Sequence, residues 1–442
     1  MKEIKDGDPA PKGETPLRSE PLPLEFPGAH YYDQEEVDAV VRVLTNRSPF
    51  RYYGLEPQHE AETFEKEFAS FLGVPHAVAV SSGTGALHAA LSALGVGPGQ
   101  EVIIPAYMWV SVIAAVVNHG AIPVLADIDE TFGLNPAAVE KQITPRTAGI
   151  IVVHMSGAPA NVKEVRKIAD AHHLFLLEDC AQCCGGRVDG QPVGTFGDMG
   201  IFSFQLNKNM TAGEGGCVVT HDERLWQRAF AAHDLGYARD SAGRLIQDDP
   251  SLRLWGRGYR MDEMRAAVLR VQLRKLPRII ESMHRSKYRI RKVLEQFPQV
   301  QLRRIVDQPG DTGCFLITTY ADNRTAQEVC SALRSEGIVT YPEGLSNIVM
   351  TDWGLHLYTN NTSLRQRSST DAKGFPWNLV ENSESHPNYE PGACPVADSL
   401  FERSIIIAIP SRLTAQDEDD IIRAFEKTLN APRGTSRQGT VM

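Results

Sequence analysis

The sequence has little of what secreted, membrane-spanning or nucleic-acid-binding proteins need. Its seven cysteines are an odd number scattered over 442 residues, unlike a disulfide framework. The longest apolar run, residues 102–117, contains Pro105 and is shorter than the roughly 20 residues of a membrane-spanning helix. The net charge is −10 without any block of like charge, which argues against a surface for nucleic acid.

The N-terminal segment, residues 1–27, is polar and rich in proline and lacks the apolar core of a signal peptide. We therefore expect a flexible arm on a soluble, cytoplasmic protein. Three cysteines stand in CAQCC (180–184), but no second Cys/His pair follows at zinc-finger spacing. We expect buried free thiols there and no metal site.

Short apolar segments alternate with helical patterns between residues 37 and 220. Strands are expected at 76–80, 101–105, 123–128, 148–155 and 174–180. This alternation predicts an α/β fold, in which a mainly parallel sheet is flanked by helices on both faces. Ligands of such folds bind at the carboxyl ends of the strands, so the residues that follow each strand are the candidates for a site.

A second, smaller α+β domain is expected at the C-terminus. A helical pattern runs from Asp262 to about Phe297, and we expect Pro277 to break or restart it. We place a large domain at residues 28–280 and the small domain at 281–442, with strands at 313–320 and 404–410. Residues 345–392 lack periodicity, which predicts a long loop.

Four strand ends carry chemically different groups. SSGTG (81–85) opens a helix whose free N–H groups suit an anion. Trp109 follows the second strand, Asp179 and Gln182 follow the strand at 174–180, and Ser203 and Lys208 precede a glycine-rich turn. Taken singly, a helix cap, a core tryptophan and a solvated lysine explain these residues at least as well. Together they supply an anion cradle, a stacking ring, a carboxylate and an amine, which a pyridoxal phosphate (PLP) site requires.

Three long stretches, residues 80–111, 178–220 and 258–276, resemble the DegT/StrS family of PLP-dependent sugar aminotransferases. The resemblance extends from about residue 35 to 290, and more weakly to the end of the chain. It implies the aspartate aminotransferase fold (PLP-transferase fold type I) and a homodimer with its active site at the subunit interface. It implies a Schiff-base lysine at Lys208, an Asp179 that pairs with the pyridine nitrogen, and a Gln182 near the ring hydroxyl. It also implies stacking by Trp109 and a phosphate site formed by Gly83, Thr84 and Ser203.

One motif departs from the family pattern. Many relatives have G-x-N-x-R where this chain has Gly256-Arg257-Gly258-Tyr259-Arg260, so Gly258 replaces an asparagine that approaches the neighbouring subunit. The candidates for a cross-subunit contact are therefore Arg257, a backbone N–H of Gly258, and Tyr259.

The reaction expected from this resemblance is transfer of an amino group from glutamate or glutamine to a keto sugar, a keto-cyclitol or a related intermediate. Dehydratases of the same fold carry histidine in place of the lysine, so Lys208 argues against that activity. A PLP-dependent lyase or cyclase stays open because fold and cofactor do not fix the reaction, and a PLP-binding regulator is a third alternative.

The long loop is expected to cover the substrate side of the site, although a solvated excursion explains its composition equally well. The side chains that would serve a polyhydroxylated ring are Trp353, His356, Tyr358, Asn360, Trp377, Asn378, His386 and Tyr389.

Overall fold

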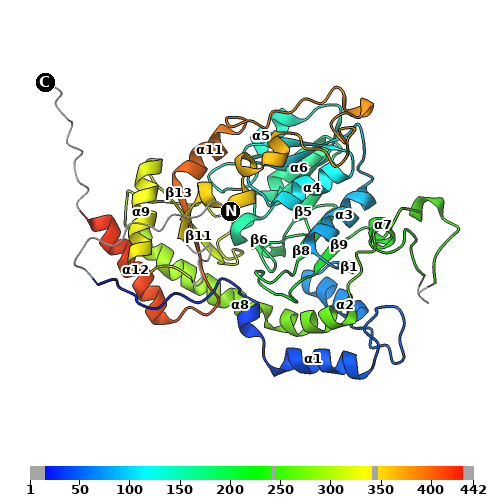
Figure 1. Ribbon diagram of the computed structural model, residues 1–442, viewed down its shortest axis with the longest axis horizontal. Coiled ribbons are helices and arrows are strands. Elements are labelled where there is room, and N and C mark those ends of the chain that lie inside the picture. Colours follow the sequence, from blue (N-terminus) through cyan, green and yellow to red (C-terminus); the bar gives the residue numbers. More distant parts are fainter. Residues whose placement is uncertain (1–14, 241–243, 341–346, 432–442) are drawn as a thin grey trace.

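The computed structural model describes residues 15–240, 244–340 and 347–431. A seven-stranded sheet crosses its centre in the order β1-β9-β8-β5-β4-β2-β3 (Figure 1). Its strands are β1 (His76–Val80), β2 (Glu101–Pro105), β3 (Ile122–Ala126), β4 (Thr147–Val153), β5 (Phe175–Asp179), β8 (Met199–Ser203) and β9 (Gly216–Thr220). Only β9 runs against its neighbours, so the predicted, mainly parallel sheet is confirmed.

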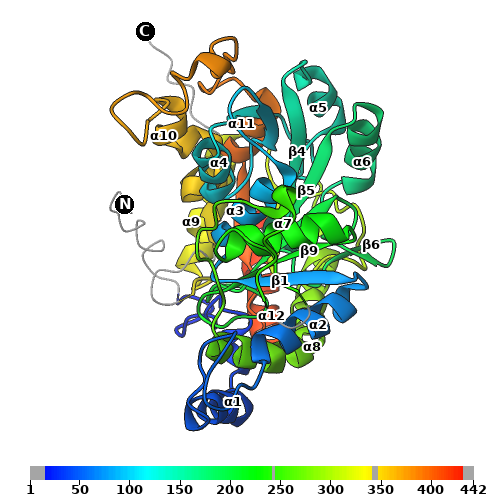
Figure 2. The same ribbon diagram turned by 90° about the vertical axis from the view of Figure 1, so that its right-hand side faces the viewer.

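Helices cover both faces of this sheet, as the alternating pattern predicts (Figure 2). One face packs on α3 (Gly83–Leu94), α4 (Val110–Asn118) and α7 (Glu223–His233). The other face packs on α2 (Glu60–Leu72), α5 (Pro136–Gln142), α6 (Val162–Ala171) and the first half of α8 (Glu263–Leu294). The strands are mostly apolar because both faces of the sheet are buried.

The C-terminal part of the chain forms a small antiparallel sheet with the strand order β10-β11-β13-β12. The strands are β10 (Gln301–Leu302), β11 (Phe315–Thr319), β12 (Asn347–Val349) and β13 (Ser404–Ala408). The helices α9 (Asn323–Ser335) and α12 (Ala415–Asn430) pack on it. A separate hairpin, β6 (Arg187–Val188) and β7 (Gln191–Pro192), lies in the large domain.

The helix α8 corrects one expectation, because Pro277 lies inside it and does not end it. A proline removes one N–H from the helix and disturbs the turn before it. Here the flanking Leu276 and Ile279 are fully buried, one in each domain's core, and this packing holds the helix together across the proline. The domain boundary expected at residue 280 therefore lies within a helix.

The N-terminal arm is not loose where the structure describes it. Leu22 is buried and its N–H donates to the Val339 carbonyl at 2.7 Å. Arg18 forms ion pairs of 2.8 Å with Asp417 and Asp420 at the start of α12. Residues 1–14 of the predicted arm lie outside the described residues. Two further helices precede β1: η1 (Ala29–Tyr31) and α1 (Gln34–Thr45).

The segment predicted as a loop, residues 345–392, contributes β12 to the small sheet and then leaves it. Its further turns are η4 (Met350–Asp352), η5 (Gly354–His356), η6 (Tyr358–Asn360), α10 (Thr362–Arg365) and η7 (Val380–Asn382). We call residues 350–392 the insertion; drawn in orange, it lies on the side of α4 and α11 (Pro395–Glu402). None of the described helices is long and apolar enough to span a membrane.

Candidate active site

One cavity of about 1730 Å³ opens at the carboxyl ends of the central strands. All seven residues that the sequence predicts for cofactor binding line it, although they come from four separate strand ends: Gly83, Thr84, Trp109, Asp179, Gln182, Ser203 and Lys208. A parallel sheet brings such residues together because its strands end at one edge. The insertion forms the remaining wall, as described below.

The start of α3 forms the base of the cavity. Ser82 caps the helix by accepting a hydrogen bond from the Gly85 N–H at 3.0 Å. The N–H groups of Gly83 and Thr84 lie in the first turn of α3 and have no carbonyl partner inside the helix. A Cβ atom on Gly83 would lie 2.7 Å from the Ser203 Cβ, so only glycine lets these two chain segments approach so closely. The base can hold an anion such as a phosphate.

Asp179 ends β5 and is buried, with 3% of its surface exposed. Its Oδ1 accepts the Ala181 N–H at 3.0 Å. Burial raises the pKa of this carboxyl group, whereas the Ala181 hydrogen bond and the nearby Lys208 lower it. A buried carboxylate of this kind gains most from a cationic partner, which a protonated pyridine nitrogen would supply.

The buried pair His154 and Glu178 supports the position of Asp179, and the sequence did not predict it. His154 donates from Nε2 to Glu178 at 3.0 Å, because its Nδ1 accepts the Ala160 N–H at 3.0 Å. The Glu178 carboxylate also accepts three backbone N–H groups of residues 194–197, at 2.7–2.8 Å. His154, Glu178 and Cys180 lie close enough to hold a metal ion, but these hydrogen bonds already engage the histidine and the carboxylate. The pair fixes the strand end that carries Asp179.

Lys208 lies in the turn that follows β8. Its backbone is held on both sides, since its N–H donates to the Gln205 carbonyl at 3.0 Å and its carbonyl accepts the Gly28 N–H at 3.2 Å. Within the described part of the chain, its Nζ has neither a hydrogen-bond nor an ion-pair partner. Burial lowers the pKa of Lys208, and the Asp179 carboxylate partly opposes this effect. A fixed, unpaired amine with a lowered pKa is suited to attack a carbonyl carbon.

Trp109 caps α4 and is 42% exposed. Its ring faces His356 of the insertion with 4.7 Å between the ring centroids, and His356 stacks on Trp353 at 4.5 Å. The Nδ1 of His356 donates to the Trp353 carbonyl at 2.8 Å, so its Nε2 accepts from Gln182 at 3.2 Å. Burial lowers the pKa of His356 to about 4, and its ring is therefore neutral near pH 7.

The insertion contributes one wall of the cavity through nine residues between 351 and 362, and we call it the 351–362 wall. Two backbone hydrogen bonds attach it to the large domain: Met108 N–H to the His356 carbonyl at 2.9 Å, and Tyr358 N–H to the Ala106 carbonyl at 3.2 Å. The expectation that the loop reaches the site holds for this 351–362 wall.

Five of the eight side chains predicted to serve the substrate do not line the cavity. Tyr358 is fully buried and donates to Asp398 at 2.8 Å, and Tyr389 donates to the Pro123 carbonyl at 2.6 Å. The prediction is wrong for them because composition alone does not distinguish packing residues from site residues. The remaining side chains that do not line the cavity are Trp377, Asn378 and His386. The side chains that do line it are Trp353, His356 and Asn360.

The predicted cross-subunit residues lie outside this cavity. Arg257 Nη1 reaches His88 Nδ1 at 3.4 Å, and the Tyr259 carbonyl accepts the Ser81 N–H at 2.8 Å. Gly258 has a φ of +70°, a left-handed conformation that asparagine also tolerates. All seven cysteines are buried and free, which confirms the buried free thiols expected at residues 180–184.

This combination of a large parallel sheet, a small antiparallel sheet and a lysine opposite a buried aspartate defines a PLP-dependent enzyme of the aminotransferase fold. Residues 32–345 match the model of the DegT/DnrJ/EryC1/StrS aminotransferase family. The chain belongs to this family and is a PLP-dependent aminotransferase.

The relatives differ in how much of the chain they match. An L-glutamine:2-deoxy-scyllo-inosose aminotransferase of Micromonospora echinospora is 36% identical over 95% of this chain and 97% of its own length. A 3-amino-5-hydroxybenzoate synthase of Amycolatopsis mediterranei is 40% identical, but the match covers 57% of this chain and 63% of that protein. The crystal structure of a 3-amino-5-hydroxybenzoic acid synthase superposes with a TM-score of 0.70 at 28% identity, covering 90% of this chain and 96% of that one.

Proposed function

We propose that this enzyme transfers the amino group of L-glutamine or L-glutamate to the ketone of a polyhydroxylated ring, a keto sugar or a keto-cyclitol. In one full cycle the donor leaves as its 2-oxo acid and the ketone leaves as a primary amine. The amino group and the carbonyl oxygen are exchanged, so no external oxidant or reductant is needed. The observation that carries the proposal is the single cavity that joins all seven predicted cofactor residues to the 351–362 wall.

The residues of the cavity divide the work among them. PLP, when bound, supplies the electron sink that lets a proton leave the carbon next to nitrogen. The start of α3 and Ser203 would hold its phosphate, Trp109 its ring face, and Asp179 the proton on its ring nitrogen. The unpaired Nζ of Lys208 would bond to its aldehyde carbon and then, once displaced by the donor, carry the proton between carbon positions.

The donor and acceptor are supported by the relative that matches along nearly the whole chain. Its name states a glutamine donor and a keto-cyclitol acceptor, and its match extends over most of the insertion-bearing C-terminal part as well. A second L-glutamine:2-deoxy-scyllo-inosose aminotransferase is matched over 60% of this chain, whereas the relatives matched over 57% and 50% carry other names.

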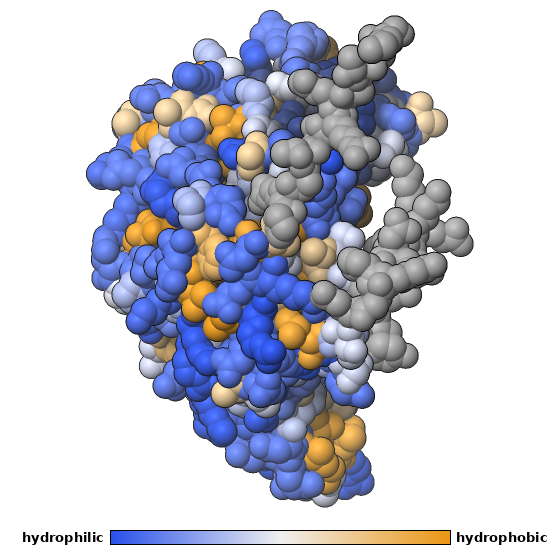
Figure 3. Space-filling view, turned by 90° about the vertical axis from the view of Figure 1, so that its left-hand side faces the viewer, coloured by the Kyte–Doolittle hydropathy of each residue, from blue (hydrophilic) through white to orange (hydrophobic). Residues whose placement is uncertain are grey.

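We also propose that the enzyme works as a homodimer. Apolar side chains that no described residue covers lie on α1, where Val37, Val41 and Leu44 are each slightly more than half exposed. This spacing forms one stripe along the helix. Hydrophobic residues gather at the lower end of the molecule in Figure 3, the end at which α1 lies in Figure 1. Arg257 and Gly258 are exposed as well, as residues that reach a partner's site must be.

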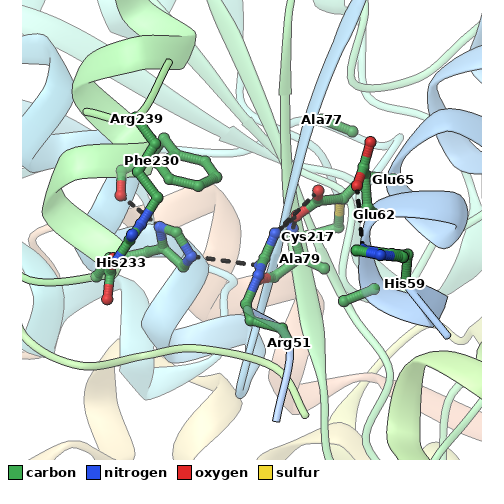
Figure 4. Close-up of polar contacts among 12 residues, drawn as sticks. Arg51, His59, Glu62, Glu65, Ala77, Ala79, Cys217, Phe230, His233 and Arg239 are labelled. Carbon is green, nitrogen blue, oxygen red and sulfur yellow. Dashed lines mark hydrogen bonds and ion pairs between the residues drawn. The ribbon is translucent and has the colours of Figure 1, made fainter. Parts of the chain in front are cut away.

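A buried arginine fixes the loop between α1 and α2, which carries the exposed Tyr53 and Leu55. Arg51 donates to both oxygens of Glu65 at 2.9 and 3.1 Å, and it approaches His233 Nε2 at 3.4 Å on its other side (Figure 4). Burial and the arginine lower the pKa of His233 to about 3, so this histidine stays neutral and accepts the hydrogen bond. The loop is thereby held in place for a partner subunit.

The test is a pair of half-reactions on purified enzyme. L-glutamine and L-glutamate should convert the absorption of bound PLP to that of pyridoxamine phosphate, and a keto-cyclitol should reverse the change. Light scattering should give a dimer, and Val41→Asp should shift it toward a monomer, whereas Val380→Asp on the insertion, also exposed, should not. A fully active monomer would refute the dimer, and no donor conversion would refute the transamination. A cytoplasmic location stays a prediction.

A further inference from the structure

Within one subunit, the described lining of the cavity is poor in positive charge. Among the described residues that line the cavity, Lys208 is the only lysine or arginine, and the proposed function commits it to the cofactor. The helix start at Gly83 and Thr84 is one anion site, which the cofactor phosphate would fill. Within its own subunit, a second phosphate or a diphosphate on the acceptor would therefore meet no further lysine or arginine among these lining residues.

Two carboxylates face the same space. Asp352 on the 351–362 wall and Glu214 in the glycine turn after Lys208 both line the cavity, and both are exposed. Like charges in a partly enclosed space repel, and the repulsion is screened less than it would be in open water. These two side chains disfavour an acceptor that carries phosphate.

The carboxylate of Asp352 is free to accept hydrogen bonds, because no described residue donates one to it. A carboxylate accepts through two oxygens, which matches two neighbouring hydroxyl groups on a ring. The wall around it is held in a fixed shape: Asn360 Nδ2 donates to the carbonyls of Thr351 and Gly354 at 2.9 and 3.0 Å. Further hydroxyl groups on the same wall belong to Thr351, Thr359 and Thr362.

We propose that the acceptor is an uncharged, polyhydroxylated ring ketone without phosphate or nucleotide, and that Asp352 selects it by accepting hydrogen bonds from its hydroxyl groups. This inference rests on the proposed aminotransferase function and narrows its acceptor to one chemical class. Asp352 is then a specificity-determining residue that acts on binding of the acceptor and not on the proton transfers at Lys208.

The experiment starts from enzyme loaded with pyridoxamine phosphate, so that it does not depend on any donor. Its return to the PLP spectrum is followed in single turnovers with 2-deoxy-scyllo-inosose and with a thymidine-diphosphate-linked 4-keto sugar. The half-saturating concentration of the uncharged ketone should be at least about tenfold lower than that of the nucleotide-linked ketone, since hydrogen bonds to a charged group contribute a factor of this size. Faster reaction of the nucleotide-linked ketone would overturn the proposal.

Asp352→Asn keeps the shape of the side chain and removes its charge. This substitution should raise the half-saturating concentration of the uncharged ketone about tenfold or more, while the limiting rate changes little. The ratio by which the enzyme prefers the uncharged ketone to the nucleotide-linked ketone should become smaller. Glu381→Gln removes an exposed carboxylate farther along the insertion, outside the cavity lining, and should change neither value. The spectrum before mixing shows that each variant is folded and loaded.

An Asp352→Asn enzyme with unchanged saturation and unchanged preference would contradict the role of this residue. The donor arm is measured separately, by adding L-glutamine to the PLP form of the wild-type enzyme. Failure of that arm refutes the proposed transamination, whereas failure of the acceptor arm alone refutes only the choice of acceptor.

Discussion

The two walls of the cavity are built in different ways. The cofactor side consists of the ends of β1, β2, β5 and β8 and the turns after them, whose positions follow from the ladder of a buried sheet. The 351–362 wall consists of short helical turns and is attached to the large domain by two backbone hydrogen bonds, at Ala106 and Met108. The cofactor side is rigid and holds the residues for the chemistry. The 351–362 wall can vary between relatives without disturbing those residues.

The largest effect is expected from removing the amine of Lys208 on the rigid side. Lys208→Ala should lower turnover by at least about 10³-fold, because it removes both the covalent anchor and the proton carrier. Borohydride reduction of wild-type enzyme should attach the cofactor to the peptide that contains Lys208, as mass spectrometry would show. Lys373→Ala, an exposed lysine of the insertion, is the control. Attachment at another lysine would contradict the assignment.

Asp179→Asn should reduce both half-reactions by about 100-fold, since the ring nitrogen would lose the partner that keeps it protonated. The apoenzyme should not lose thermal stability, because burial raises the pKa of Asp179 and so makes its charged form costly when no cation is bound. Stopped-flow absorbance and thermal unfolding measure the two effects. If both half-reactions kept their normal rates, Asp179 would have no role in the chemistry and would only cap the chain after β5.

The uptake of PLP by the apoenzyme should depend on pH through Lys208. A lysine attacks an aldehyde only when it is neutral, and burial lowers its pKa below the ordinary 10.5. The rate of uptake should therefore rise with pH to a plateau with its midpoint below that value. Because the Asp179 carboxylate raises the pKa of Lys208, Asp179→Asn should move the midpoint lower still. A midpoint that stays at 10.5 would show that the amine is solvated.

The smallest effects separate the near and far halves of the insertion. His356→Leu should weaken acceptor binding several-fold, since the His356 side chain itself forms part of the 351–362 wall and its polar ring is lost. Asn382→Ala, in the far half, should leave acceptor kinetics unchanged but lower the unfolding free energy by about 1–3 kcal/mol. Its side chain donates to the Gly120 and Pro376 carbonyls and accepts from Gly99. If Asn382→Ala weakened acceptor binding and His356→Leu only lowered stability, the far half of the insertion would bind the acceptor and the near half would be structural.

The sequence predicts the rigid side well because apolar strands alternate with helices and the polar residues follow each strand directly. It does not predict the support under Asp179. Glu178 stands out as a charge within an apolar strand, but its partner His154 becomes visible only once β4 and β5 pair side by side. The position of the 351–362 wall also depends on tertiary contacts at Ala106 and Met108, and no local pattern records them.

The unbroken α8 has a consequence for how the molecule unfolds. Its first half lends Leu269 and Leu276 to the core of the large sheet, and its second half lends Met283 and Leu294 to the core of the small one. A helix is cooperative along its length, so loss of either core removes tertiary support from the other. We therefore expect the whole chain to unfold in one transition, with amide protons near Pro277 among the slowest to exchange.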